Sequence, residues 1–71
     1  MTESDRKNAF RIAYDFMERH LPVKFTGEYF ADALDDIRKL RANNKDNVLL
    51  EHLLIGIYEY FVRISKEEHK E

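Results

Sequence analysis

The chain has no cysteine, one proline and two glycines among its 71 residues. Without cysteine, neither a disulfide nor a thiolate metal site can reinforce the fold. A cysteine-free composition also fits a reducing compartment, and we expect the protein to be cytoplasmic. Because Pro22 and Gly27 are the only breaks indicated, the connections between regular elements should be short.

Long apolar runs and a strong net charge are also missing. The longest apolar stretch, 48–64, is shorter than the roughly 20 residues that cross a bilayer, and it is interrupted by charged residues. The N-terminal segment 1–8 is polar and shows no signal-peptide pattern. The formal net charge is −2, with both signs spread along the chain. We therefore expect no membrane association and no binding to nucleic acid.

Three amphipathic stretches predict an all-α fold. They cover residues 5–20, 27–43 and 47–66, and the charged tail 67–71 is expected to fray. A chain this short forms one domain with a thin core, since it buries only about 60% of the surface that its unfolded form exposes. We predict a single domain over residues 1–71, arranged as a compact three-helix bundle with short turns.

The first two helices carry recognisable start signals. Thr2 or Ser4 can cap the first helix and Thr26 the second, because a hydroxyl accepts a hydrogen bond from a free N–H of the first turn. Phe25 and Phe30 have the spacing of a hydrophobic staple around Thr26. The expected core positions are Ala9, Phe10, Ile12, Ala13, Phe16 and Met17 in the first helix, and Phe30, Ala33, Leu34, Ile37 and Leu40 in the second.

The third helix has more apolar surface than a surface helix needs. Its main stripe, expected against the other two helices, is Leu50, Leu53, Leu54, Ile57, Phe61 and Ile64. A second line, Val48, Ile55 and Val62, repeats every seven residues and lies well away from that stripe. Since an amphipathic helix needs only about a third of its circumference to be apolar, the surplus predicts a further contact.

We interpret this surplus as a partner-binding surface made by Val48, Ile55, Tyr58 and Val62. The predicted function is a small non-enzymatic protein–protein interaction or regulatory module that forms a homodimer or binds another protein. Gly56 favours a close approach nearby, because a glycine in mid-helix costs about 1 kcal/mol relative to alanine. An alternative stays open: the third helix could be central, straddled by the other two, and its extra apolar surface would then be core.

A second alternative concerns the acidic face of the second helix, formed by Glu28, Asp32, Asp35 and Asp36. These carboxylates could block a basic surface of an enzyme or nucleic-acid-binding protein, as a small inhibitor of the phage or mobile-element type would. Carboxylates four residues apart could also share a divalent cation. The third reading is an ordinary solvated helix face.

The sequence shows no pattern for catalysis or for a cofactor. His20, His52 and His69 include no pair at the helical spacing of a metal site, and there is no glycine-rich phosphate loop. The basic cluster Arg38, Lys39, Arg41 and Lys45 precedes a helix whose first turn is apolar, unlike a helix that reads the major groove. We therefore expect no enzyme activity, no metal and no cofactor.

Overall fold

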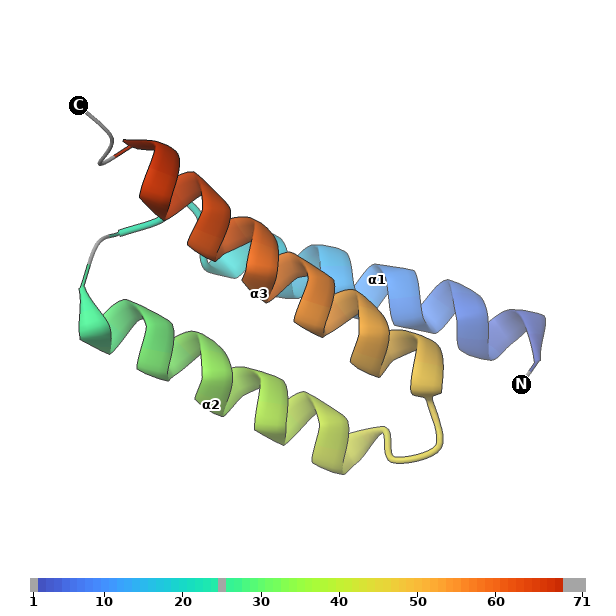
Figure 1. Cartoon of the computed structure of the whole chain (residues 1–71). Coiled ribbons are helices and arrows are strands. Elements are labelled where there is room, and N and C mark those ends of the chain that lie inside the picture. The colour runs from blue at the N-terminus through green and yellow to red at the C-terminus, as the bar shows by residue number, and fades with distance from the viewer. Residues whose placement is uncertain (1, 25, 69–71) are drawn as a thin grey trace.

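A computed structural model describes residues 2–24 and 26–68 of the chain. Its helices are α1 (Glu3–Arg19), α2 (Gly27–Asn43) and α3 (Val48–Glu68) (Figure 1). These ranges contain no β-strand, so the prediction of an all-α fold with three helices is confirmed. The second helix has the predicted bounds, and α3 continues two residues beyond its predicted end. His69 and the rest of the predicted fraying tail, 69–71, lie outside the described residues.

Hydroxyl and amide side chains start all three helices. Thr2 and Asp5 form a capping box: each backbone N–H donates to the other's side chain at 3.1 Å. The bond from the Thr2 backbone N–H holds the pKa of the Asp5 carboxyl below its usual value. Thr26 accepts from the Tyr29 N–H, and Asn47 accepts from the Leu50 N–H. Phe25 lies outside the described residues, so the staple with Phe30 stays a prediction.

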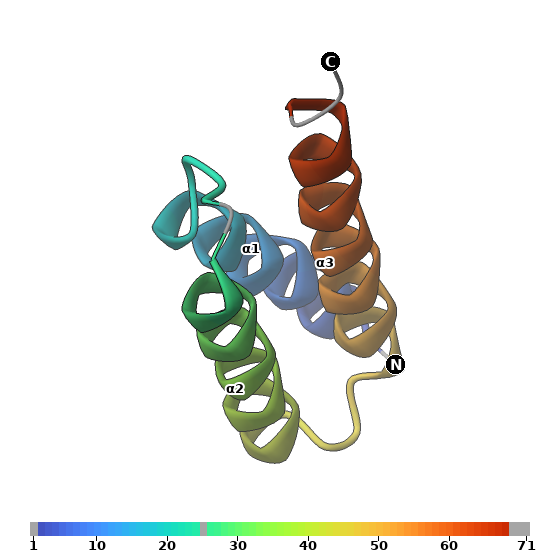
Figure 2. The same ribbon diagram turned by 60° about the vertical axis from the view of Figure 1, so that its left-hand side comes forward.

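The helix α3 packs against both other helices, and more extensively against α1 than against α2. It runs parallel to α1 and antiparallel to α2 (Figures 1 and 2). The Asn47 side-chain N–H, just before α3, donates to the Asp5 carbonyl oxygen at 3.1 Å and joins the starts of the two parallel helices. The helix α2 therefore leads the chain back toward the start of α1, and α3 begins there and runs alongside α1 (Figure 1).

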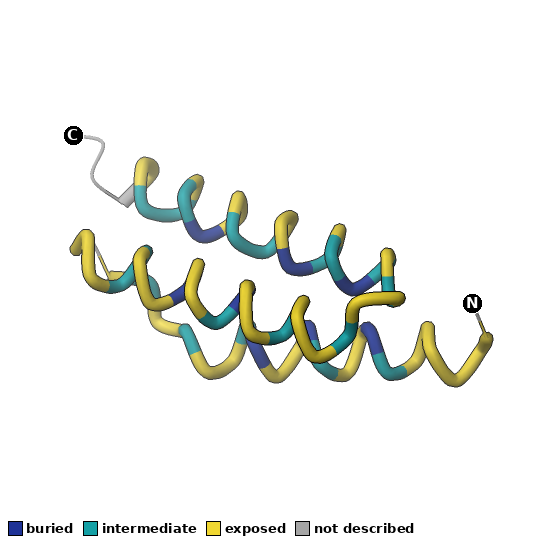
Figure 3. Tube along the Cα trace, turned by 90° about the horizontal axis from the view of Figure 1, so that it is seen from below, coloured by how far each residue is buried: buried dark blue, intermediate teal, exposed yellow. Residues whose placement is uncertain are grey.

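Each helix turns its buried residues toward the middle of the molecule (Figure 3). Three of the five buried residues of α1 and α2 are alanines, whereas the buried residues of α3 are large. The buried set is Ala9, Ala13, Phe16, Ala33, Ile37, Leu50, Leu54 and Phe61. Two expected core residues lie largely outside this set: Phe10 is 58% exposed and Leu34 is 38% exposed.

The ring of Phe61 joins the three helices at one end of the core. Its centroid lies 6.0 Å from that of Phe16 on α1 and 6.0 Å from that of Tyr29 on α2. The His20 ring is 6.4 Å away. Centroid separations of about 4.5–7 Å are typical of favourable aromatic pairs. A single α3 side chain therefore contacts aromatic rings of both α1 and α2.

We expect Phe61→Ala to lower the free energy of unfolding by about 3–5 kcal/mol, because it removes a fully buried ring and leaves a cavity. Phe10→Ala, at an exposed position on α1, should cost less than about 1 kcal/mol. Urea unfolding followed by circular dichroism measures both. Equal losses for the two variants would contradict the core as described.

Candidate functional site

The flank of α3 singled out in the sequence remains accessible in the folded chain. Val48 is 56% exposed and Ile55 is 42% exposed, while Tyr58 and Val62 are half-buried. The helix does contact both neighbours, as the alternative with a central third helix supposes. Tyr58 takes part in those contacts, but Val48 and Ile55 are exposed and are not core residues. We call Val48, Ile55, Tyr58 and Val62 the α3 flank.

The helix α2 borders one edge of the α3 flank. The Tyr58 ring packs edge-on against Phe30 of α2, with centroids 6.1 Å apart and planes at 82°. Further toward the start of α3, Arg41 of α2 forms an ion pair with Glu51. Because residues seven apart share a helix edge, these contacts define the α2 side of the flank. The opposite edge carries His52, Glu59 and Lys66, all of them exposed.

One residue of α2 extends the apolar surface. A notch of about 370 Å³ between α2 and the start of α3 is lined by both Arg38 and Val48, which places that side of α2 beside the flank. Leu34 lies one turn before Arg38 on the same side of α2. The 38% exposure of Leu34 therefore adds apolar area next to the flank.

Cations surround the same notch. Arg38, Arg41 and Lys45 line it together with Asn44 and Asn47. Arg41 is already paired with Glu51, whereas neither Arg38 nor Lys45 forms an ion pair with a carboxylate of the described residues. Lys39, counted with them in the sequence, points elsewhere and pairs with Asp35. The end of the flank near Val48 is therefore electropositive.

A second exposed apolar surface lies on the α1 side, where the sequence did not predict one. Phe10 and Tyr14 are 58% and 59% exposed, and Tyr60 of α3 is 51% exposed. The spacing of four between Phe10 and Tyr14 was the available signal, since it places both rings on one face of α1. Gly56, expected at a close contact, faces open space: a methyl group added there would meet nothing within 4 Å.

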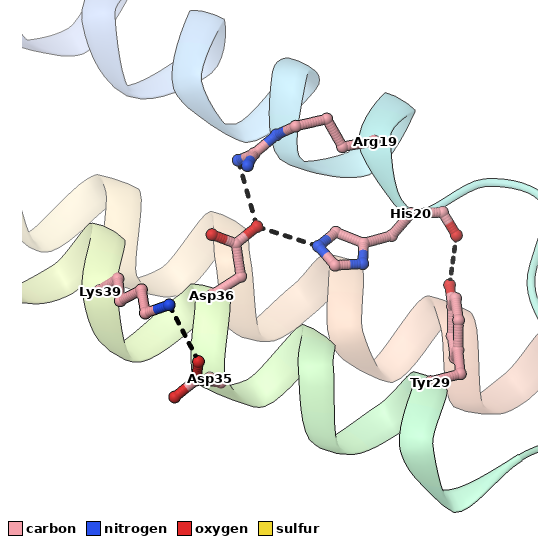
Figure 4. Close-up of polar contacts among 6 residues, drawn as sticks. All are labelled: Arg19, His20, Tyr29, Asp35, Asp36 and Lys39. Carbon is pink, nitrogen blue, oxygen red and sulfur yellow. Dashed lines mark hydrogen bonds and ion pairs between the residues drawn. The ribbon is translucent and has the colours of Figure 1, made fainter.

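The acidic face of α2 differs from the solvated row expected. Asp36 is half-buried and turns toward α1, where its Oδ2 lies 3.2 Å from Arg19 Nη2 and 2.9 Å from His20 Nε2 (Figure 4). Asp35 pairs with Lys39 at 3.2 Å on the outer surface. Glu28 and Asp32 remain exposed, and both border a hollow that Arg19 and Lys24 also line. Two of the four carboxylates are thus neutralised within the chain.

The Asp36 contacts form a polar junction between the end of α1 and the middle of α2. The Tyr29 hydroxyl strengthens it by donating to the His20 carbonyl oxygen at 2.6 Å (Figure 4). The His20 ring bonds to Asp36 and also packs against the Phe16 ring, with centroids 4.7 Å apart. Burial raises the pKa of the Tyr29 phenol above its ordinary value of 10.0.

The side chains do not gather into a site for a metal ion. In residues 2–24 and 26–67, no three histidine, aspartate or glutamate side chains stand close enough together to hold one. Among the described helices, none combines the length and apolar character needed to cross a bilayer. What the geometry does offer is an apolar flank with an electropositive end.

Comparison with models of protein families, with curated proteins and with solved structures gives no match to this chain.

Asp36→Asn should lower the free energy of unfolding by about 1–3 kcal/mol, because it weakens the ion pair with Arg19 and the hydrogen bond with His20 at a half-buried position. The matched control is Asp35→Asn, which disrupts an exposed pair four residues apart and should cost at most about 0.5 kcal/mol. Urea unfolding at neutral pH compares the two. A larger loss for Asp35→Asn would show that the junction does not join α1 to α2 as described.

Tyr29→Phe should cost about 1 kcal/mol at neutral pH, through loss of the bond to the His20 carbonyl. Because the raised pKa belongs to the folded state, the phenol's contribution is complete below pH 10 and is lost as the pH rises through the folded-state value. The wild-type and Tyr29→Phe stabilities should therefore converge above about pH 10 in pH-dependent urea unfolding. Tyr14→Phe, at an exposed ring, should show no such convergence.

Proposed function

We propose that this chain is a small non-enzymatic protein–protein interaction module that binds its partner through the α3 flank. The observation that carries the proposal is the exposure of Val48 and Ile55 on a helix that already contacts both of its neighbours. Covering a branched apolar side chain contributes about 1.5–3 kcal/mol when burial is complete. Association with a partner at the α3 flank would therefore remove Val48 and Ile55 from water.

The flank has the features of an interaction surface. Its centre is apolar, and Tyr58 contributes a large ring with a polar tip, a type enriched where proteins meet. Charged residues border both edges, with Glu51 on one and Glu59 on the other. An apolar centre inside a polar rim is the usual anatomy of a protein interface. Leu34 of α2 enlarges the centre beyond what α3 alone supplies.

The acidic face of α2 is the weaker basis for a function. An inhibitor that mimics a polyanion needs its carboxylates free, but Asp36 is held by Arg19 and His20, and Asp35 is held by Lys39. Glu28 and Asp32 alone make a small negative surface. Salt distinguishes the two proposals, since screening weakens contacts between exposed charges far more than apolar contacts.

The flank can be tested by photo-crosslinking from a benzophenone side chain placed at position 48. In cells that express the chain, we expect a covalent adduct with a protein, which mass spectrometry identifies as a second copy or as another chain. Ile55→Asp should abolish the adduct, because it places a charge at the centre of the contact. Its helix content by circular dichroism should stay unchanged, because Ile55 is largely outside the core.

Phe10→Asp is the matched control, since it places the same charge on the other exposed apolar surface. The adduct should persist in this variant. If Phe10→Asp abolishes the adduct and Ile55→Asp leaves it, the interaction surface is on α1 and the proposal is wrong. Absence of any protein adduct from positions 48 and 55 would refute it as well.

A further inference from the structure

The apolar residues of the α3 flank are arranged symmetrically about Ile55. Val48 precedes it by seven residues and Val62 follows it by seven, so the same side chain stands at both ends. Across a two-fold axis the contacts are reciprocal: if one residue contacts a second residue of the other copy, that second residue contacts the first in return, and only a residue on the axis meets its own counterpart. With Ile55 on that axis and the helices antiparallel, Val48 of each copy lies level with Val62 of the other.

On this basis, and given the proposed function, we propose that the partner at the α3 flank is a second copy of the chain. Its α3 lies antiparallel to the first, with the two Ile55 side chains meeting at the two-fold axis. This orientation makes one sequence complementary to itself, which a closed two-fold dimer requires. No other feature of the partner has to be assumed.

The charges beside the flank favour the antiparallel orientation. His52 and Glu59 share the exposed edge of α3, because they are seven residues apart. In the antiparallel register, position 52 lies level with position 58 of the other copy, so His52 of each copy is adjacent to Glu59 of the other. Two such pairs flank the axis. A parallel two-fold pair would instead place this edge beside the opposite edge of the other copy, which carries Glu51 and Tyr58, so the contacts between His52 and Glu59 would not form.

The apolar contact is short. From Val48 to Val62 the helix advances about 21 Å. Leu34 of α2 adds apolar area beside this stretch. The area that so short a contact buries is at or below that of a standard interface, which is about 800 Å² on each partner. We therefore expect a reversible dimer, with the mass in solution rising from monomer to dimer as the concentration increases.

The absence of cysteine allows a direct test by single-cysteine crosslinking in the full chain. Under mild oxidation, Ile55→Cys should form a disulfide-linked dimer. Val48→Cys and Val62→Cys, each tagged differently and then mixed, should form the mixed dimer in preference to either self-dimer. Phe10→Cys is the control for random collision and should crosslink at least tenfold more slowly than Ile55→Cys. Circular dichroism verifies that each variant keeps the helix content of the wild type.

Exchanging the side chains at positions 52 and 59 gives an independent test, which is measured as a change in the dissociation constant of the dimer. Glu59→Lys and His52→Glu should each weaken the dimer about fivefold, because each variant removes the two contacts between positions 52 and 59 of the dimer. The double variant should regain wild-type affinity, because it reverses the pair without removing it. Sedimentation equilibrium measures all four proteins.

Three results would overturn the inference: self-crosslinking of Val48→Cys in preference to the mixed dimer, equal rates for Phe10→Cys and Ile55→Cys, or a monomeric mass at every concentration. In the last case, a photo-adduct of position 48 with a different protein, lost in Ile55→Asp, would leave the proposed function standing and refute only the identity of the partner. Loss of both the dimer and every adduct would refute both.

Discussion

One helix provides the core contacts of both others. The buried residues of α3 lie against α1 on one side and α2 on the other, while α1 and α2 have little direct contact with each other. All the packing that stabilises the chain therefore depends on the apolar surface of α3. This constraint explains why the helix is so rich in apolar residues, and it also explains why a part of them remains in reach of solvent. A helix that serves two neighbours presents an arc wider than either neighbour can cover.

The polar junction links α1 to α2, which otherwise have little direct contact with each other. Asp36 in the middle of α2 forms an ion pair with Arg19, the last residue of α1, and a hydrogen bond with His20, the residue that caps α1. The junction is half-buried rather than sealed, so its charges keep partial contact with water and avoid the full cost of desolvation. Apolar packing sets the position of α3 between its neighbours, and hydrogen bonds set the position of its neighbours relative to each other.

The sequence predicted the elements well because the signals for them are local. Thr2 was among the caps that marked the start of α1, and Thr26 and Gly27 marked the start of α2. It predicted the exposure of Val48 and Ile55 for the same reason, since a seven-residue repeat is visible without knowing the partner helices. Phe10 and Asp36 were assigned wrongly because their environments depend on where α1 lies relative to α2. No periodicity within one helix shows which of two adjacent faces a neighbouring helix will cover.

Because α1 and α3 run parallel, α2 acts as a spacer between the end of α1 and the start of α3. Since α3 has to begin beside the start of α1, the intervening helix must carry the chain back over the whole length that α1 has advanced, and the two helices have the same number of residues, 17. An added or deleted turn of α2 would slide Leu50 and Leu54 along α1 by about 5 Å, out of register with Ala9 and Ala13. Evolution of this fold can therefore lengthen α1 and α2 only together.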